Sequence, residues 1–338
     1  MGNFCHEAIE RYSSSLKADG KTFKSVTADE REKYIEVAIS QTFEHMAKVA
    51  TLEDATQKYI VESLKDTLRH TVEIITTQVS RGEFEPELFE EVIRTEIRDS
   101  KTNEILANLK GKVDRIDLTD SDDRAVRIID YKSSDHKLDL SETYHGLSLQ
   151  LPIYMGVVLD KLKEKYPGVA LHPSAMLYYE MANKFLELSS SKAATEEERL
   201  KLSKMDGLLS NDPADLAAND LTVGTMEGQT KVSSIVPYGI KVNGEPSERD
   251  TNAIDRSAMQ TVIDYSMLAA ADTAKHIIAG DFEPSPARLG NIDACRYCNY
   301  KSVCHFNENE TGFSVRAFDK AKKNSEVVEL MKEKLEEE

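Results

Sequence analysis

Two short segments carry residues whose types and spacing suit metal-dependent chemistry. Asp114 lies in the first, at residues 111–117, and Asp130 and Lys132 lie in the second, at residues 128–134. Residues two apart on a strand share a face, so Asp130 and Lys132 point the same way while Tyr131 turns to the other side and offers its backbone carbonyl. If the segments pair, Asp114 approaches Asp130, and the carboxylates can hold a hard cation such as Mg²⁺ (or Mn²⁺). Such a cation activates water and stabilises charge on a phosphate, while Lys132 positions the nucleophile or neutralises that charge.

The alternative is that these residues are ordinary surface charges. An Asp followed two residues later by Lys is often a solvated pair at the end of a strand. Asp130, however, follows the apolar run at residues 126–129, where an unpaired carboxylate is costly to bury unless something binds it. Arg115 and Asp117 are compatible with a surface pair and are left out of the catalytic set.

The elements that must position these residues are strands. Residues 92–98 and 104–118 show strand-like alternation, and residues 126–131 are a short run rich in β-branched residues. Polar turn formers at residues 119–124 predict that the last two runs form an antiparallel hairpin. Asp114 and Asp130 are therefore expected on neighbouring strands.

The remaining pattern is mainly helical. Helices are predicted at residues 3–16, 27–50, 52–81, 147–162, 255–279 and 325–338. The last is acidic and amphipathic, which is typical of a solvated or docking helix. Further strands are predicted at residues 175–180 and 232–242, and residues 209–230 are interpreted as a long surface excursion. The fold class is therefore mixed α/β.

Composition narrows the function classes. The 338 residues include 43 Lys and Arg against 60 Asp and Glu, a net charge of -17. A general positive field that coats nucleic acid is thereby excluded, so any DNA contact must be local. No apolar run approaches the length of a membrane span, and the N-terminus lacks a secretory h-region. We expect a soluble cytoplasmic protein with no membrane partner.

Several segments, in order, resemble one known family. They are residues 2–8, the two segments around Asp114 and Asp130, residues 146–154, and the cysteines near the C-terminus. The set resembles the RecB-type nucleases of the PD-(D/E)XK superfamily, most closely the C-terminal nuclease domains of AddB-type subunits. The resemblance runs nearly end to end. It implies a restriction-endonuclease-like core with a central mixed β-sheet flanked by helices, plus an N-terminal helical segment.

This resemblance implies three parts of the chain and a set of roles. The parts are residues 1–90, an N-terminal helical part; residues 91–310, the nuclease core with the cysteine cluster; and residues 311–338, an acidic C-terminal helix. The resemblance implies that His6, Asp114 and Asp130 are metal ligands, and the strand pattern adds the carbonyl of Tyr131. The predicted catalytic residues are Asp114, Asp130, Lys132, Gln150 and Tyr154.

Gln150 and Tyr154 match the family's Q-x3-Y element, and their spacing places both on one helix face, where they could orient Lys132 or a DNA phosphate. The alternative is a helix packed through Tyr154. For His6 the alternative is a hydrogen-bonded or exposed residue of the N-terminal helix.

Cys295, Cys298 and Cys304 form a C-x2-C-x5-C array, a strong signal for ligands. In the family that this chain resembles, three such cysteines join a distant upstream cysteine to hold a [4Fe–4S] cluster, which takes four ligands. This chain begins only five residues before His6. The resemblance therefore implies a fragment of a longer protein, with the cluster present in full length but absent or incomplete in this chain.

Two residues offer a fourth ligand within the chain. Cys5 is expected instead to be a small buried residue, because it lies next to the histidine of the expected active site. His305, next to Cys304, would complete a Cys3His set that suits zinc.

The function implied by the resemblance is that of a Mg²⁺-dependent DNA exonuclease in an AddAB-type helicase-nuclease of double-strand break repair and recombination. Its partners would be single-stranded DNA and an AddA-like helicase-nuclease subunit. The alternatives are a catalytically silent structural module of a DNA-processing complex and a free-standing nuclease of the CRISPR-associated or phage type.

Overall fold

The computed structural model describes residues 2–47, 55–134, 136–181, 195–223, 231–281, 283–290, 292–296, 298–310, 312–320 and 323–337. The chain divides into two compact units. The first is formed by Met1–Ile93, Gly111–Leu138 and Val157–Arg256, and the second by Arg94–Lys110, Asp139–Gly156 and Ser257–Glu338.

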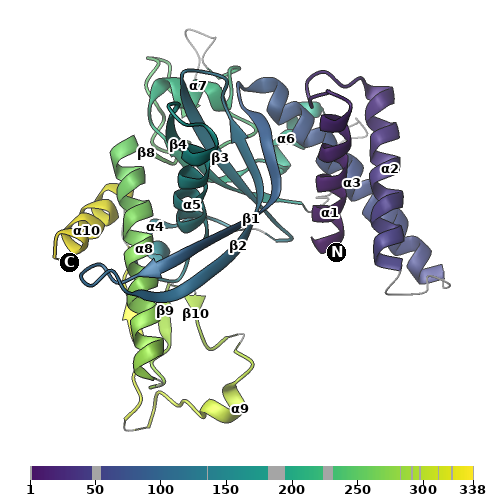
Figure 1. Ribbon diagram of the computed structural model, residues 1–338. Helices are drawn as coiled ribbons and strands as arrows, with labels where there is room; N and C mark the ends of the chain where they lie inside the picture. Colours follow the sequence, from purple (N-terminus) through teal and green to yellow (C-terminus); the bar gives the residue numbers. More distant parts are fainter. Residues whose placement is uncertain are drawn as a thin grey trace. The chain divides into compact units, whose positions relative to one another are not determined.

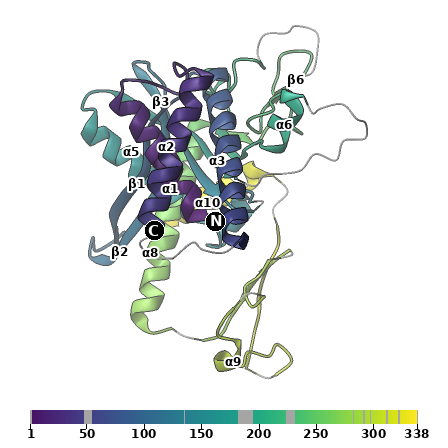
Figure 2. The ribbon, with the colours of Figure 1, turned by 90° about the vertical axis from the view of Figure 1, so that its right-hand side faces the viewer.

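Three helices open the first unit (Figure 1, Figure 2): α1 (Gly2–Ala18), α2 (Ala28–Ala47) and α3 (Ala55–Arg81). Helix α1 contacts both others. Its buried residues Phe4, Ala8, Tyr12 and Leu16 recur every four positions, which places them on one face. The three predicted helices are confirmed, while the predicted ends between residues 48 and 54 lie outside the described part of the chain.

A six-stranded sheet has the order β1-β2-β3-β4-β5-β8. Its strands are β1 (Glu85–Arg98), β2 (Ile105–Leu118), β3 (Asp123–Lys132), β4 (Ala170–Glu180), β5 (Asp206–Ser210) and β8 (Ala253–Ile254). Strand β3 is antiparallel to β2 and parallel to β4, so the sheet is mixed. The predicted α/β fold and the predicted hairpin are both confirmed.

One face of the sheet packs on the opening helices. Ile129 and Tyr131 of β3 and Leu177 and Tyr179 of β4 belong to the same buried cluster as the apolar stripe of α1. Residues two apart on each strand contribute to this face, as pleating requires. The core therefore holds the strand that carries Asp130 and Lys132 against the helix that carries His6.

The chain beyond β4 corrects two expectations. The predicted surface excursion at residues 209–230 contains a helix, α7 (Pro213–Asn219), where Asp212 accepts a hydrogen bond from the N–H of Ala214. An N-cap Asp followed by Pro at the first helical position is a helix signal that was missed. The predicted strand at 232–242 is wrong: only β6 (Lys231–Val232) and β7 (Gly239–Ile240) are strands there, with bends between them.

The second unit includes the outer ends of β1 and β2. Its other elements are α4 (Leu140–Tyr144), the start of α5 (Gln150–Lys165), α8 (Arg256–Ala279) after its first residue, β9 (Ala287–Leu289), β10 (Ile292–Asp293), α9 (Lys301–Cys304), β11 (Arg316–Phe318) and α10 (Asn324–Glu337). Ile97 of β1 packs on Ala271 and Ala274 of α8. Helix α10 contacts α4 and buries three side chains, Val327, Val328 and Met331, so the acidic tail docks through its apolar face.

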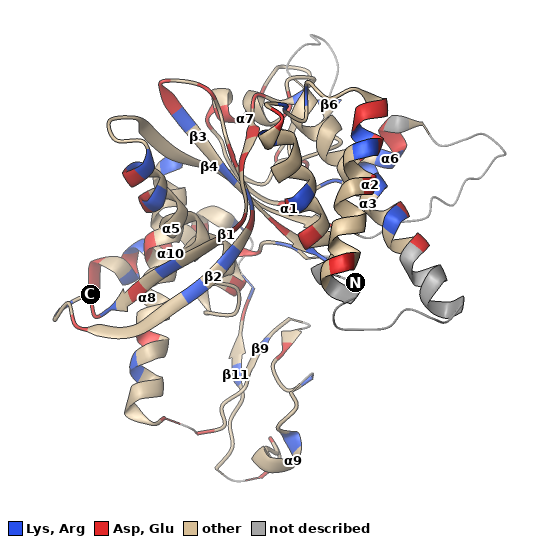
Figure 3. Cartoon of the chain, turned by 45° about the vertical axis from the view of Figure 1, so that its right-hand side comes forward, with Lys and Arg blue, Asp and Glu red and all other residues tan. Residues whose placement is uncertain are grey.

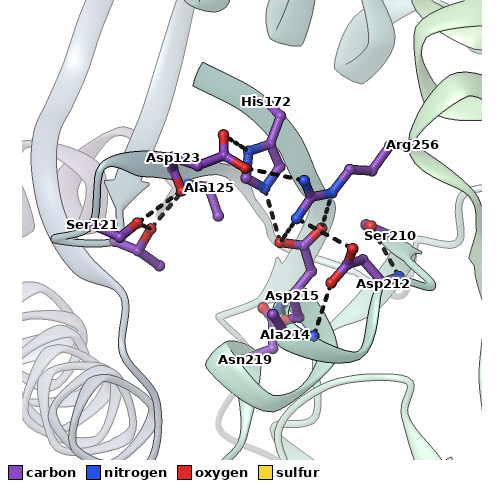
Figure 4. Close-up of polar contacts among 11 residues, drawn as sticks. Ser121, Asp123, Ala125, His172, Ser210, Asp212, Ala214, Asp215, Asn219 and Arg256 are labelled. Atoms are coloured by element: carbon purple, nitrogen blue, oxygen red, sulfur yellow. Dashed lines mark hydrogen bonds and ion pairs between the residues drawn. The ribbon is translucent and has the colours of Figure 1, made fainter. Parts of the chain in front are cut away.

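A polar cluster fastens α7 and the start of α8 to the sheet within the first unit (Figure 4). His172 of β4 bonds Asp123 at 2.8 Å through Nδ1 and Asp215 of α7 at 2.9 Å through Nε2. Arg256 donates to Asp215 through Nε, at 3.0 Å, and through Nη2, at 3.1 Å. Because Asp215 is buried, these charge-assisted bonds satisfy a carboxylate that would otherwise be costly to enclose.

Candidate active site

The β2–β3 pair positions the two aspartates that were predicted from the sequence. Arg115 pairs with Ile129 and Ile116 with Ile128, so continuing the register by one residue sets Asp114 opposite Asp130. Both are buried, with 7% and 3% of their surface exposed. The N–H of Tyr131 donates to Oδ2 of Asp114 at 2.5 Å. The prediction that the two carboxylates lie on adjoining strands is therefore confirmed, while their role stays a prediction.

Helix α1 and strand β1 bring two further candidate ligands, His6 and Glu90, close to Asp114. The Nδ1 of His6 lies 3.0 Å from Oε1 of Glu90 and 3.2 Å from Oδ1 of Asp114. These three residues can each offer one ligand atom, all within 4.8 Å of one another. Carboxylate oxygens with an imidazole nitrogen fit a divalent cation of the Mg²⁺ or Mn²⁺ type. The donor set therefore suits the metal that the sequence predicted.

Glu90 was not among the predicted site residues. Strand β1 was predicted to begin at residue 92, whereas it begins at Glu85, because the acidic residues before Val92 hide its alternation. Glu90 also has φ 50°, a left-handed conformation that is uncommon for a residue with a side chain. Only its place in an acidic run could have suggested it, and such runs usually face solvent.

The charged groups of the site shift one another's pKa values. Burial opposes a charge on His6, but hydrogen bonds to Asp114 and Glu90 raise the pKa of His6 to about 10. Burial, together with the charge of Asp114, raises the pKa of Asp130. Although burial acts against it, hydrogen bonds from His6 and Lys112 lower the pKa of Glu90. Closely spaced carboxylates that resist joint ionisation are an environment that a bound cation relieves.

Lys132 lies where the strand pattern predicted it. Its Nζ is 2.6 Å from Oδ2 of Asp130, on the same face of β3, and 5.3 Å from the centre of the Tyr178 ring. Tyr131 turns to the opposite face, where its ring is buried against Tyr179. Strand β3 thus positions the Lys132 ammonium beside the Asp130 carboxylate, within reach of a substrate bound at that carboxylate.

Arg115 and Asp117 are not the surface pair that the sequence suggested. Both are fully buried, and the guanidinium of Arg115 donates to Asp117 at 2.7 and 2.6 Å. Arg127 of β3, exposed by only 1%, donates to the same carboxylate at 3.0 and 2.6 Å. A charged residue on a strand is compatible with either environment until its partner on the next strand is known, which explains the error. The three residues form a buried ion cluster next to the site residues.

A cavity of about 890 Å³ opens beside the candidate metal ligands. Its lining includes residues of α1 and α2 and the side chains of Glu90, Lys112 and Asp114. The volume is at the upper end of the range for ligand pockets, so the carboxylates face a space that admits a sizeable substrate.

Gln150 and Tyr154 lie on one helix, as expected. Gln150 is the first residue of α5, Tyr154 lies one turn later, and both are half-buried within the second unit. Their proposed action on Lys132 or on a phosphate stays a prediction.

The three clustered cysteines of the second unit line one cavity of about 400 Å³. Cys295 is half-buried, and Cys298 and Cys304 are exposed. Cys5, in contrast, is buried in α1, and burial raises the pKa of its thiol to about 11. Cys5 is therefore the small buried residue that was expected, and the other three line one cavity.

No helix among the described residues has the length and apolarity needed to cross a membrane.

Comparisons of the sequence with known proteins identify relatives of the chain. A model of the PD-(D/E)XK nuclease superfamily matches residues 1–305. The B subunit of an ATP-dependent helicase/deoxyribonuclease from Lachnoclostridium phytofermentans is 29% identical over 94% of this chain and 27% of its own length. The equivalent B subunits from Lysinibacillus sphaericus and Clostridium botulinum are 34% and 28% identical over 67% and 99% of this chain, and 19% and 29% of their own lengths. The chain thus spans less than a third of each of these relatives.

Proposed function

The chain belongs to the PD-(D/E)XK nuclease superfamily, and from this premise we propose that it hydrolyses phosphodiester bonds of DNA with a divalent cation, Mg²⁺ or Mn²⁺. The observation that carries the proposal is the convergence of His6, Glu90 and Asp114 within 4.8 Å, on a cavity of about 890 Å³. Asp130 and Lys132 complete the set from the adjoining strand.

Each residue has a task that follows from its position. When bound, the cation supplies Lewis-acid activation of water and stabilises charge on the phosphate. Asp114 and Asp130 would hold it together with His6 and Glu90, and the backbone carbonyl of Tyr131 would be a further ligand. Lys132 donates to the attacking water or to a phosphate oxygen, because its ammonium is fixed at 2.6 Å from Asp130.

The finer proposal is an exonuclease acting on a single strand within an AddAB-type helicase-nuclease of double-strand break repair. The names of the relatives, which combine helicase and deoxyribonuclease, support it. A strand delivered by an AddA-like partner does not require a broadly basic surface, which agrees with the net charge of -17.

The cavity lined by the three clustered cysteines is a candidate site for a structural cofactor. We propose that Cys295, Cys298 and Cys304 are ligands of an iron–sulfur cluster, because their thiols line one cavity and thiolates are the usual cluster ligands. The donor set of three is one short of the four that a [4Fe–4S] cluster takes.

The nuclease proposal is tested with end-labelled single-stranded DNA and Mg²⁺, comparing wild-type, Asp130→Asn and Lys132→Ala proteins. Each substitution should lower the cleavage rate by about 10²–10³-fold or more, the size seen when a transition-state contact is removed. The exposed Asp122→Asn is the matched control. A circular single strand that resists cleavage supports an exonuclease. Equal cleavage by all variants contradicts the site, and a folded wild type without cleavage favours the silent structural module.

A further inference from the structure

Lys112 lies in the cavity but has no role in the proposed metal site. It precedes Asp114 by two residues on β2, so both side chains leave the strand on the same side. Its ammonium pairs with Oε2 of Glu90, and 53% of its side chain is exposed. Lys112 is thus a cation that reaches from the sheet toward the open cavity.

Glu90 is shared between two cations. Its Oε1 lies 3.0 Å from His6 and its Oε2 pairs with Lys112. The Glu90 side chain is only 4% exposed and its backbone is held at φ 50°, so the carboxylate has little freedom. Lys112 has a flexible four-carbon stem and a half-exposed side chain, so its ammonium can turn to another partner without leaving solvent. Of the two residues, Lys112 is the one that can exchange its partner.

The other charges of the cavity make an exchangeable cation useful. Acidic and basic residues are interspersed along β1 and β2, the strands that carry Glu90 and Lys112 (Figure 3). Among the described residues that line the cavity, Arg11 and His45 both pair with Glu7, at 2.6 and 2.8 Å. A phosphodiester entering beside Asp114 and Glu90 therefore needs a local positive charge, and Lys112 is placed to give it.

We propose that Lys112 binds a phosphate of a single DNA strand next to the cleaved bond. Glu90 would pair with Lys112 in the metal-free site and would release it on coordinating a divalent cation. The inference rests on the proposed nuclease function and extends it to the strand-binding step. It assigns the cavity along α1 to a single strand, with Lys112 as its phosphate contact beside the metal site.

The test measures equilibrium binding of a fluorescent single-stranded oligonucleotide by anisotropy, as a function of salt. A phosphate contact on a single strand contributes about 0.7 to the slope of log K against log salt. In EDTA, Lys112→Gln should leave the wild-type slope unchanged, because Glu90 occupies Lys112. Glu90→Gln should steepen the slope by about 0.7, and the double variant should lose that gain. With Ca²⁺ in place of EDTA, Lys112→Gln alone should lower the wild-type slope by about 0.7.

Two matched variants separate this effect from general charge. Glu91→Gln removes the same charge one residue away, from a carboxylate that pairs with Lys161 instead, and should not change the slope through Lys112. Lys110→Gln removes an exposed lysine two residues earlier on β2, and its effect should not depend on Ca²⁺. If Lys112→Gln does not change the slope of log K against log salt, either in the Glu90→Gln background or in Ca²⁺, this inference alone is overturned. Failure of the folded wild type to cleave the same oligonucleotide with Mg²⁺ overturns the nuclease proposal as well.

Discussion

The backbone N–H of Tyr131 donates a 2.5 Å hydrogen bond to Oδ2 of Asp114, across the β2–β3 pair. Because the neighbouring strand takes one carboxylate oxygen, Asp114 presents the other, Oδ1, to His6 at 3.2 Å. The donor lies between Asp130 and Lys132 in the chain. The orientation of Asp114 is therefore set by the backbone that also positions the other two candidate catalytic residues.

Replacing Asp130 by Asn is expected to remove the stabilisation that Mg²⁺ gives to the folded protein. For the wild type, a ligand at 100 times its dissociation constant adds about 2.7 kcal/mol. Without Mg²⁺ the variant should be at least as stable as the wild type: burial and the charge of Asp114 raise the pKa of Asp130, so ionising it at neutral pH costs stability. Thermal unfolding with and without Mg²⁺ measures both effects. An equal Mg²⁺ shift in variant and wild type would contradict Asp130 as a ligand.

Replacing Asp117 by Ala should destabilise the protein by about 3–5 kcal/mol, because it leaves the buried guanidinium groups of Arg115 and Arg127 without their shared carboxylate. Urea unfolding gives the difference. The control is Asp120→Ala, at a carboxylate whose side chain is 99% exposed, which should change stability by less than about 0.5 kcal/mol. A loss at Asp117 no larger than that at Asp120 would show that the ion cluster is not important for folding.

The hairpin and its aspartates could be predicted because their signals are local. A β-branched run, a polar turn and a two-residue period are enough to place Asp114 near Asp130 and Lys132 beside it. The opening helices are predictable for the same reason, since their apolar periodicity lies within each segment.

Glu90 and Arg115 could not be predicted, because their environments depend on distant residues. Glu90 meets His6 across 84 positions of sequence, from a left-handed backbone that no local pattern requires. Arg115 is buried because it pairs with Asp117, a carboxylate that it shares with Arg127 of the next strand. In both cases the sequence shows a charged residue, but only the fold shows which residue it pairs with.

Replacing Cys295 by Ser is expected to lower the iron and sulfide content of anaerobically prepared protein, because Cys295 lines the cavity with Cys298 and Cys304. Cys5→Ala is the matched control. Its thiol is buried in α1 with a pKa raised to about 11, so its removal should leave the iron content unchanged. Iron lost from the Cys5 variant would show that Cys5 is a ligand, and iron unaffected by Cys295→Ser would contradict the proposed cluster.

The polar cluster at His172 has a charge that depends on pH. Burial disfavours the charged imidazole, but hydrogen bonds to Asp215 and Asp123 raise its pKa above 6.5. Asp215 shows the opposite shift: burial acts against it, while bonds from His172 and Arg256 lower its pKa below 3.8. The pair therefore contributes its full stabilisation of the folded protein between pH 3.8 and pH 6.5, the ordinary pKa values of the two groups. Its contribution is lost as the pH rises through the raised pKa of His172, or falls through the lowered pKa of Asp215.

Replacing His172 by Gln should accordingly destabilise the protein by about 1.5–3 kcal/mol near pH 5.5, the range for hydrogen bonds to charged groups. The difference from wild type should shrink as the pH rises, because the wild-type imidazole then loses the proton that binds both carboxylates. Urea unfolding of the two proteins across this pH range measures it. The matched control is His276→Gln, at an exposed histidine that pairs with Asp281 near the end of α8, which should cost about 0.5 kcal/mol or less at every pH. A constant difference between wild type and His172→Gln would mean that the ring acts by packing alone, since only the charged imidazole can donate to Asp123 and Asp215 at once.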